Sequence, residues 1–205
     1  MSSKQRRVLL TGATGFVGSA VQQRIVADEQ YDLTIAVRRS VPTESAVRVV
    51  QVPELTAQTD WRDALQGVDV VIHAAARVHV MNETSNDPLA EFRKVNVDGT
   101  LALARQAVAA GVQRFVFVSS IKVNGEGTEL GQPYTADALA QPSDPYGVSK
   151  YEAEQALLAL AQETGLEVAI VRPVLVYGPG VKANFRSMMQ WVQRGVPLPL
   201  GAIHN

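Results

Sequence analysis

The sequence of 205 residues predicts an α/β fold built on a doubly wound parallel sheet. Short apolar runs alternate along it with stretches of helical periodicity, and a glycine-rich turn joins the first run to the first such stretch. Serines and a turn rich in alanine follow later apolar runs. Strands that alternate with helices form βαβ units, whose ligands bind at the carboxyl edge of the sheet. We therefore expect one dinucleotide-binding domain over residues 1–180, with its site at that edge.

The composition favours a protein with a substantial core: 46% of the residues are apolar and 19% are charged. The formal net charge of -1 gives no electrostatic reason to expect nucleic acid or an anionic membrane surface. No run approaches the roughly 20 apolar residues of a membrane span. The chain has no cysteine, and His73, His79 and His204 are not spaced as metal ligands. We expect a cytoplasmic protein with no metal, no nucleic-acid partner and no membrane partner.

The first strand, Val8–Leu10, leads into a turn with glycines at positions 12, 15 and 18 and then into a helix. Glycines at such a turn let main-chain N–H groups approach a phosphate, and the helix dipole favours the same anion. Small residues there can also serve chain reversal alone. We expect the pyrophosphate of a dinucleotide to bind this loop. The residues predicted to contact it are Gly12, Thr14, Gly15, Phe16, Val17 and Gly18.

A second strand, Leu33–Val37, ends in Arg38 and Arg39. In dinucleotide folds the tip of this strand faces the adenosine ribose, where an acid holds the 2′-hydroxyl of NAD and arginine accommodates the 2′-phosphate of NADP. The arginines therefore predict a preference for NADP(H) over NAD(H). The alternative is that they are solvated charges at a strand end.

The remaining elements alternate in the same way. We take His73, at the end of an apolar strand, as a structural histidine. The helix over 89–110 should bury a stripe formed by Val97, Leu101, Ala104 and Val108. The other expected elements are strands at 47–52, 68–73, 114–118 and 168–172, a short helix at 60–66, a loop at 125–144 and a helix from Pro145 to Gly165.

Several of these segments together resemble the extended short-chain dehydrogenase/reductases, the NAD(P)-dependent epimerase/dehydratase family. The segments are Thr11-Gly12-Ala13-Thr14-Gly15-Phe16-Val17-Gly18, His73-Ala74-Ala75-Ala76 and Asn96-Val97-Asp98-Gly99-Thr100. The resemblance implies a Rossmann-type sheet of order 3-2-1-4-5-6, and an asparagine, Asn96, that ties the fourth and fifth strands together. It also implies that the cofactor lies beside Ala74, Ala75, Ala76 and Pro173.

Tyr146 and Lys150 are four residues apart, hence one turn apart on one face of the predicted helix. The preceding strand ends in Ser120, so the three groups can meet at the carboxyl edge of the sheet. A solvated Tyr–Lys pair would show the same spacing. The resemblance implies that Ser120, Tyr146 and Lys150 are catalytic: Tyr146 exchanges a proton with the substrate, Ser120 binds the same oxygen and Lys150 holds the nicotinamide ribose. A phenol titrates near about 10, and we expect the charge of Lys150 to lower the pKa of Tyr146.

Two departures narrow the reaction that the resemblance implies. Sugar 4,6-dehydratases carry an Asp-Glu pair just after the catalytic hydroxyl, whereas Ile121 and Lys122 follow Ser120 here. Asn124 stands where epimerases commonly have a tyrosine, which counts against an ordinary UDP-glucose epimerase. The segments 119–125 and 178–185 look like those of a subgroup from bacterial surface-polysaccharide biosynthesis. In this view Ser120, Tyr146 and Asn184 bind a nucleotide sugar, which we expect to be UDP-linked.

The leading hypothesis is hydride transfer at C4 of a UDP-hexose. It leaves two reactions open: a 4-epimerase, which keeps one NAD bound, and a 4-keto-6-deoxy-sugar reductase, which consumes NADPH. Two other classes also remain: a redox-sensing module that binds the dinucleotide without catalysis, and a reductase of a non-sugar carbonyl.

The end of the sequence has the chemistry of a loop, with Pro197, Pro199 and Gly201. By resemblance, residues 181–205 begin a small substrate-binding lobe that is truncated here. The resemblance also implies a homodimer formed through the helices near 89–110 and 145–165.

Overall fold

The computed structural model describes residues 5–40, 42, 47–78, 86–181 and 183–198. Its centre is a parallel six-stranded sheet of order β3-β2-β1-β4-β5-β6, which confirms the predicted order. The strands are β1 (Arg6–Thr11), β2 (Tyr31–Val37), β3 (Arg48–Gln51), β4 (Val70–His73), β5 (Arg114–Val118) and β6 (Glu167–Val171).

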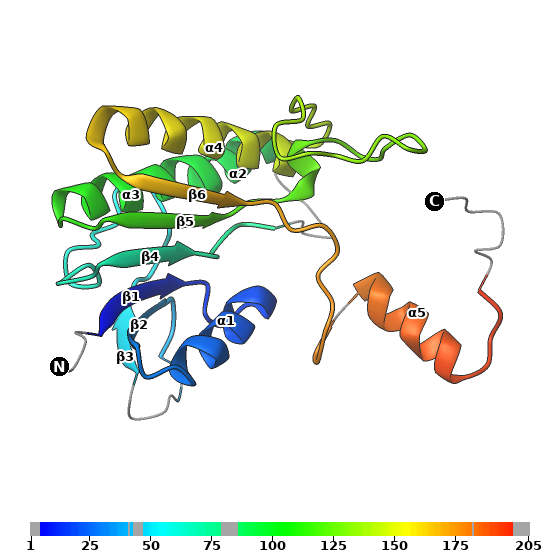
Figure 1. Ribbon diagram of the computed structural model, residues 1–205, viewed down its shortest axis with the longest axis horizontal. Coiled ribbons are helices and arrows are strands. Elements are labelled where there is room, and N and C mark those ends of the chain that lie inside the picture. The colour runs from blue at the N-terminus through cyan, green and yellow to red at the C-terminus, as the bar shows by residue number, and fades with distance from the viewer. Residues whose placement is uncertain (1–4, 41, 43–46, 79–85, 182, 199–205) are drawn as a thin grey trace.

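The helices cover the two faces of the sheet unequally (Figure 1). One face carries α1 beside β1, β2 and β3, and the other carries α2, α3 and α4 beside β4, β5 and β6. This is the arrangement that right-handed crossovers produce when the strand order reverses at β1. The helical elements are α1 (Phe16–Val26), α2 (Pro88–Arg93), the π-helix η1 (Lys94–Gly99), α3 (Thr100–Ala109), the 3₁₀ helix η2 (Ile121–Val123), α4 (Pro145–Thr164) and α5 (Ala183–Gln193).

Two apolar clusters fix the layers. Successive residues of β1 point to opposite faces, so Leu9 packs in one cluster while Val8 and Leu10 pack in the other. The cluster of Leu9 includes Leu103 of α3 and Leu157 of α4, both fully buried. Because both faces are covered, β1 is a continuous apolar run rather than an alternating one.

The expected short helix at 60–66 is not formed, and that prediction was wrong. Trp61 and Leu65 are buried as helical spacing requires, and the Leu65 N–H donates to the Trp61 carbonyl at 2.9 Å. The segment nevertheless consists of turns and stops before Gly67, which has a φ of +69°. Gln106 of α3 binds its start instead, accepting from the Trp61 N–H at 2.8 Å.

The helix expected at 89–110 is interrupted by the π-helix η1. The extra residue in a π-turn shifts the phase of everything that follows it. Ala104 of the predicted stripe is fully buried, but Leu101 is only half-buried and Leu103 takes the inward position. The predicted stripe is therefore right only in part. The shift also turns Asn96 inward, where it is 1% exposed.

The last two helices differ in how they join the sheet. Helix α4 begins at Pro145, as predicted, after Asp144, whose carboxylate accepts from the Gly147 N–H at 2.6 Å. It ends before Gly165, which has a left-handed φ of 75°. Helix α5 stands apart from the sheet at its carboxyl edge (Figure 1). Among the described residues, no helix combines the length and apolarity that crossing a membrane requires.

Candidate active site

The glycine loop between β1 and α1 uses its glycines in two ways. A Cβ on Gly12, which has a φ of +74°, would lie 2.6 Å from backbone atoms of Ala74 and Ala75, and a Cβ on Gly18 would lie 2.0 Å from the Gly12 carbonyl oxygen. These two glycines are therefore needed for the chain to pack against itself. Gly15 is exposed and precedes α1, whose first turn has no acidic side chain and no side-chain cap. The free N–H groups of that turn can donate hydrogen bonds to an anion.

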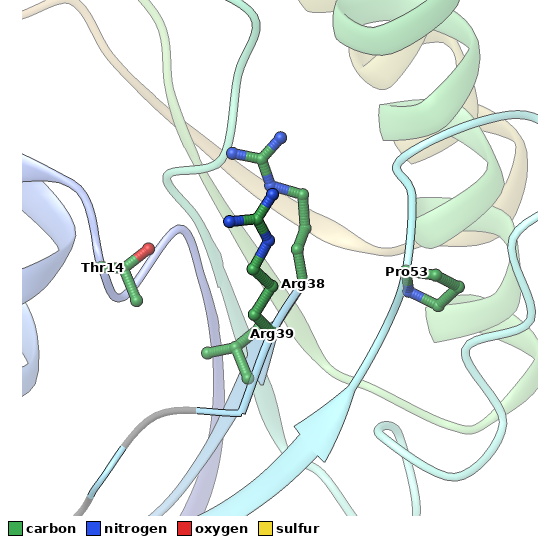
Figure 2. Close-up of a pocket in the computed structure, with 5 residues that line it drawn as sticks. Thr14, Arg38, Arg39 and Pro53 are labelled. Carbon is green, nitrogen blue, oxygen red and sulfur yellow. The ribbon is translucent and has the colours of Figure 1, made fainter.

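Arg38 and Arg39, which follow β2, lie beside this loop. They line a pocket of about 470 Å³ together with Thr14, Val37 and Pro53. Figure 2 shows both guanidinium groups pointing the same way, into the space between Thr14 and Pro53. None of the five lining residues is acidic, so the pocket offers positive charge and open backbone to a ligand. The residues present fit the phosphates of a dinucleotide.

His73 is a buried structural residue, which agrees with the sequence interpretation. It is 0% exposed, and its two ring nitrogens are hydrogen-bonded to the hydroxyls of Thr11 at 2.7 Å and Thr100 at 3.0 Å. Burial, assisted by the charge of Lys150, lowers the pKa of His73 to about 3. The ring is therefore neutral and holds the exit of β4, where Ala74, Ala75 and Ala76 are half-buried.

Asn96 ties different elements from those we expected. Its side chain accepts from the Arg77 N–H at 2.8 Å and donates to the Arg77 carbonyl at 3.0 Å and to the Ser149 hydroxyl at 2.9 Å. It therefore joins the segment after β4 to helix α4, not β4 to β5. The prediction named a structural role correctly but named the wrong partners, because Asn96 is bound by Arg77 and Ser149.

The structure brings Ser120, Tyr146 and Lys150 together at the carboxyl edge of the sheet. Ser120 follows β5 and caps η2, accepting from the Lys122 N–H at 3.2 Å. The Ser120 side chain also lies near enough to Tyr146, in the first turn of α4, to lower the pKa of its phenol. Lys150 lies one turn further along, is 1% exposed, and places its Nζ 4.0 Å from the centre of the Phe117 ring. Ser120 and Tyr146 thus lie near one another, and Lys150 lies one turn along α4 from Tyr146, over the end of β5.

The electrostatics of this group differ from our expectation. Burial raises the pKa of Tyr146, and the hydrogen bond from Ser120 offsets this only in part, while the charge of Asp144 adds to the rise. We expected Lys150 to hold the Tyr146 pKa down, and the structure does not show this. Lys150 is itself buried, which lowers its own pKa to about 7, while the charge of Glu154 acts in the opposite direction. Removal from water dominates at both residues.

Three other predicted positions have different outcomes. The carbonyl of Pro173 accepts from the Ile121 N–H at 3.1 Å, so Pro173 lies beside the segment that follows Ser120. Asn184 belongs to α5, but its side chain lies outside the described part of the structure. Asn124, taken as a departure from epimerases, is 2% exposed and accepts from Arg172 at 3.2 Å. It has a structural partner in this chain.

Sequence reasoning missed Glu154. This residue is fully buried on α4 and pairs with Arg172 at the end of β6, with Nη2 and Oε2 2.5 Å apart. Its position could have drawn attention, since Glu154 follows Lys150 by four residues, as Lys150 follows Tyr146. The partner could not be found in this way, because Arg172 lies 18 residues further along the chain.

Comparisons with known proteins agree with this geometry. Residues 8–195 match the model of the NAD dependent epimerase/dehydratase family. A UDP-glucose 4-epimerase of Vibrio cholerae is 47% identical over 198 residues, which cover 97% of this chain and 60% of that protein. A 3 beta-hydroxysteroid dehydrogenase/Delta 5-->4-isomerase of Mycobacterium tuberculosis is 30% identical over 201 residues, or 95% of this chain and 54% of that protein. The chain thus spans only about 60% of the length of the Vibrio relative.

Solved structures show the same similarity. MoeE5 in complex with UDP-glucuronic acid and NAD aligns with a TM-score of 0.76 and 32% identity, covering 94% of this chain and 63% of that one. UDP-glucuronic acid 4-epimerase from Bacillus cereus, in complex with UDP-glucuronic acid and NAD, aligns with a TM-score of 0.78 and 25% identity, covering 94% and 64%. With the family model matching nearly the whole chain, this protein belongs to the NAD dependent epimerase/dehydratase family.

Proposed function

We propose that this protein is a nucleotide-sugar 4-epimerase that acts on a UDP-hexose. The observation that carries the proposal is the meeting of Ser120, Tyr146 and Lys150 at the edge of the sheet that also carries the glycine loop. Relatives and structural neighbours named as UDP-sugar epimerases support the substrate class. The Vibrio relative also outweighs the sequence argument from Asn124 against a UDP-glucose epimerase.

In the proposed mechanism NAD(P)⁺, when bound, supplies the acceptor for the hydride from C4 of the sugar. Tyr146, as the phenolate, takes the proton of the 4-hydroxyl and later returns it. Ser120 donates a hydrogen bond to the same oxygen and keeps it in line with the phenol. Lys150, one turn along α4 from Tyr146, binds the nicotinamide ribose. Since hydride and proton both return, the sugar changes only its configuration at C4, and nothing is consumed.

The cofactor would be held by the loop from Gly12 to Gly18, by Ala74, Ala75 and Ala76, and by Pro173. We propose that NADP(H) is preferred, because Arg38 and Arg39 point into a pocket whose five described lining residues include no acid. This pocket also favours a second candidate function, a 4-keto-6-deoxy-sugar reductase, since reductases consume NADPH. The solved neighbours named above contain NAD, which favours the epimerase.

The test is an assay of the full-length protein on a panel of UDP-sugars. An epimerase interconverts the C4 epimers, retains its nicotinamide through purification and causes no net change in absorbance at the NADPH wavelength. Stoichiometric loss of NADPH with a UDP-4-keto-6-deoxy-hexose would establish the reductase instead. A protein that binds the dinucleotide but turns over no sugar would contradict both, and the remaining candidates would be a redox-sensing module or a reductase of a non-sugar carbonyl.

We further propose the setting in which the protein works. The subgroup resemblance of residues 119–125 and 178–185 supports a role in surface-polysaccharide biosynthesis in the cytoplasm, where nucleotide sugars are made. Residues 181–205 would begin a substrate-binding lobe, with Asn184 near the diphosphate.

Helices α3 and α4 lie side by side on the outside of the sheet (Figure 1), where they could pair with a second copy. Light scattering of the full-length protein would show the dimer.

A further inference from the structure

Helix α4 presents three ionisable groups in one line. Tyr146, Lys150 and Glu154 follow one another at intervals of four residues, so each lies one turn from the next. Lys150 is 1% exposed and Glu154 is 0% exposed. A buried charge without a partner is strongly unfavourable, so a buried lysine or glutamate must either be paired or lose its charge.

Glu154 is held rigidly from the neighbouring strand. The Nε of Arg172 donates to both carboxylate oxygens, at 3.0 and 3.2 Å, and Nη2 donates to Oε2 at 2.5 Å. A second amino group of Arg172 donates to Oδ1 of Asn124 at 3.2 Å. Asn124 directly follows η2, the short helix that Ser120 caps. The network therefore connects the middle of α4 to the segment that carries the catalytic hydroxyl.

In the part of the chain that the structure describes, the other groups around Lys150 supply no negative charge. From β5 the ring of Phe117 faces the ammonium group at 4.0 Å. From β4 the fully buried His73 is neutral, and from its own helix Tyr146 is a phenol whose pKa is raised. Among the described residues, Glu154 is the carboxylate whose charge acts on Lys150 to keep its proton bound.

We infer that Glu154 is a positioning residue for the reaction: held by Arg172, which also binds Asn124, its carboxylate favours the ammonium form of the buried Lys150, one turn along α4 from Tyr146. The inference rests on the roles proposed above for Tyr146 and Lys150. Glu154 itself touches neither Tyr146 nor a reacting atom, and acts through Lys150.

Helix α4 offers a matched control for this carboxylate. Glu152 is two residues away on the same helix and forms a two-point ion pair with Arg93 of α2, with Nε and Oε2 2.8 Å apart. Its side chain is 32% exposed, against 0% for Glu154. Glu152→Gln and Glu154→Gln therefore make the same chemical change and each break one ion pair, but only the second removes a charge next to Lys150.

The experiment follows the titration of Lys150 by NMR. The chain has five lysines, so ¹³Cε signals in lysine-labelled protein are few, and loss of a signal in Lys150→Arg assigns it. We expect a midpoint near 7 in the parent, a midpoint lower by about one pH unit in Glu154→Gln, and no change in Glu152→Gln. An unchanged midpoint in Glu154→Gln, or equal shifts in both variants, would overturn the inference.

A second variant keeps the test decisive if Glu154→Gln leaves Arg172 unpaired and fails to fold. Glu154→Gln/Arg172→Gln removes both charges and restores hydrogen-bonding partners. The Lys150 midpoint should again fall, by less than in the single variant, because the positive charge of Arg172 is also gone. A midpoint equal to that of the parent would show that Glu154 and Arg172 act on Lys150 only as a neutral pair, which contradicts the inference.

Activity provides an independent readout on the full-length protein. If Lys150 must be charged for turnover, kcat falls as pH rises through its pKa, so in Glu154→Gln the alkaline limb should move to lower pH by the shift seen by NMR. An alkaline limb that stays in place while the NMR midpoint moves would show that Lys150 need not be charged. The titration requires no turnover, so failure of the proposed function and failure of this inference are distinguishable.

Discussion

The two halves of the sheet differ in the groups that form their parts of the proposed site: one half uses mainly backbone, and the other uses buried side chains. Around β1, β2 and α1, the proposed cofactor side depends mainly on backbone: glycines that admit no Cβ and the open start of a helix, with two exposed arginines beside them. Around β5, β6 and α4, the proposed catalytic side depends on buried side chains, with Lys150 and Glu154 almost completely removed from water. The first half is therefore sensitive to volume, and the second to charge and pH.

This difference has a thermodynamic basis. A backbone cradle offers N–H groups that are already oriented, so it needs no particular side chains and tolerates solvent. The protonation state of a buried ammonium group is set by its neighbours. Its pKa therefore changes when a nearby charged residue is removed. The four changes below test whether the halves are separable in this way, beginning with the largest expected effect.

Tyr146→Phe should lower kcat of the full-length protein by about 10²–10⁴-fold while leaving dinucleotide affinity within about threefold of the parent. The variant removes only the phenolic oxygen, and the proposed pyrophosphate site lies in the other half. Steady-state kinetics and calorimetric titration of the cofactor measure the two quantities separately. Turnover within tenfold of the parent would remove Tyr146 from the mechanism, and a parallel loss of affinity would show that the halves are not separable.

Gly12→Ala should lower the free energy of unfolding by roughly 2–5 kcal/mol, because a Cβ meets the backbone of Ala74 and Ala75 and the residue must keep a left-handed conformation. Gly111→Ala is the control for conformation alone. It has a φ of +80° with nothing within 4 Å of a Cβ, so a loss of about 1–2 kcal/mol is expected. Urea unfolding of the two variants gives the comparison. Equal losses would mean that the contact between the loop and β4 is not tight.

His73 should make the fold less stable in acid. Its pKa in the folded protein, about 3, lies below the ordinary value of 6.5, so the unfolded chain binds the proton first. The contribution of His73 is complete above pH 6.5 and is lost as pH falls toward 3, at about 1.4 kcal/mol per pH unit. Between pH 7.5 and 5 we expect the parent to lose about 2 kcal/mol more than His73→Gln, measured by urea unfolding at each pH. Identical losses in the two proteins would show that burial in the folded protein does not lower the pKa of His73.

Arg38→Ala should weaken NADPH binding by about ten- to a hundredfold and leave NADH binding nearly unchanged, since a charged hydrogen bond to the 2′-phosphate is lost. Calorimetry with both cofactors on both proteins measures this. The exposed Arg62, which pairs locally with Asp60, provides a control: Arg62→Ala removes a positive charge away from this pocket. Equal losses for NADPH and NADH in Arg38→Ala would mean that Arg38 shapes the loop without recognising the phosphate.

The features that could be predicted from the sequence are those that depend on residues close together along the chain. The glycine spacing, the strand ends at Arg38 and Ser120, and the four-residue interval from Tyr146 to Lys150 each involve neighbours along the chain. Such features can be predicted because helices and strands each place side chains on a given face at a fixed interval along the chain. The sheet order followed once those motifs indicated the family, and the structure confirms it.

The tertiary structure decided the remaining features, because they depend on residues that are distant in sequence. The π-turn at η1 forms where Asn96 can reach both Arg77 and Ser149, and no helical spacing reveals it. The pKa of Lys150 and the direction of the Tyr146 shift are set by burial, which packing of α4 on the sheet imposes. Residue spacing determines which groups share a face, whereas the charge those groups carry depends on what the rest of the fold places around them.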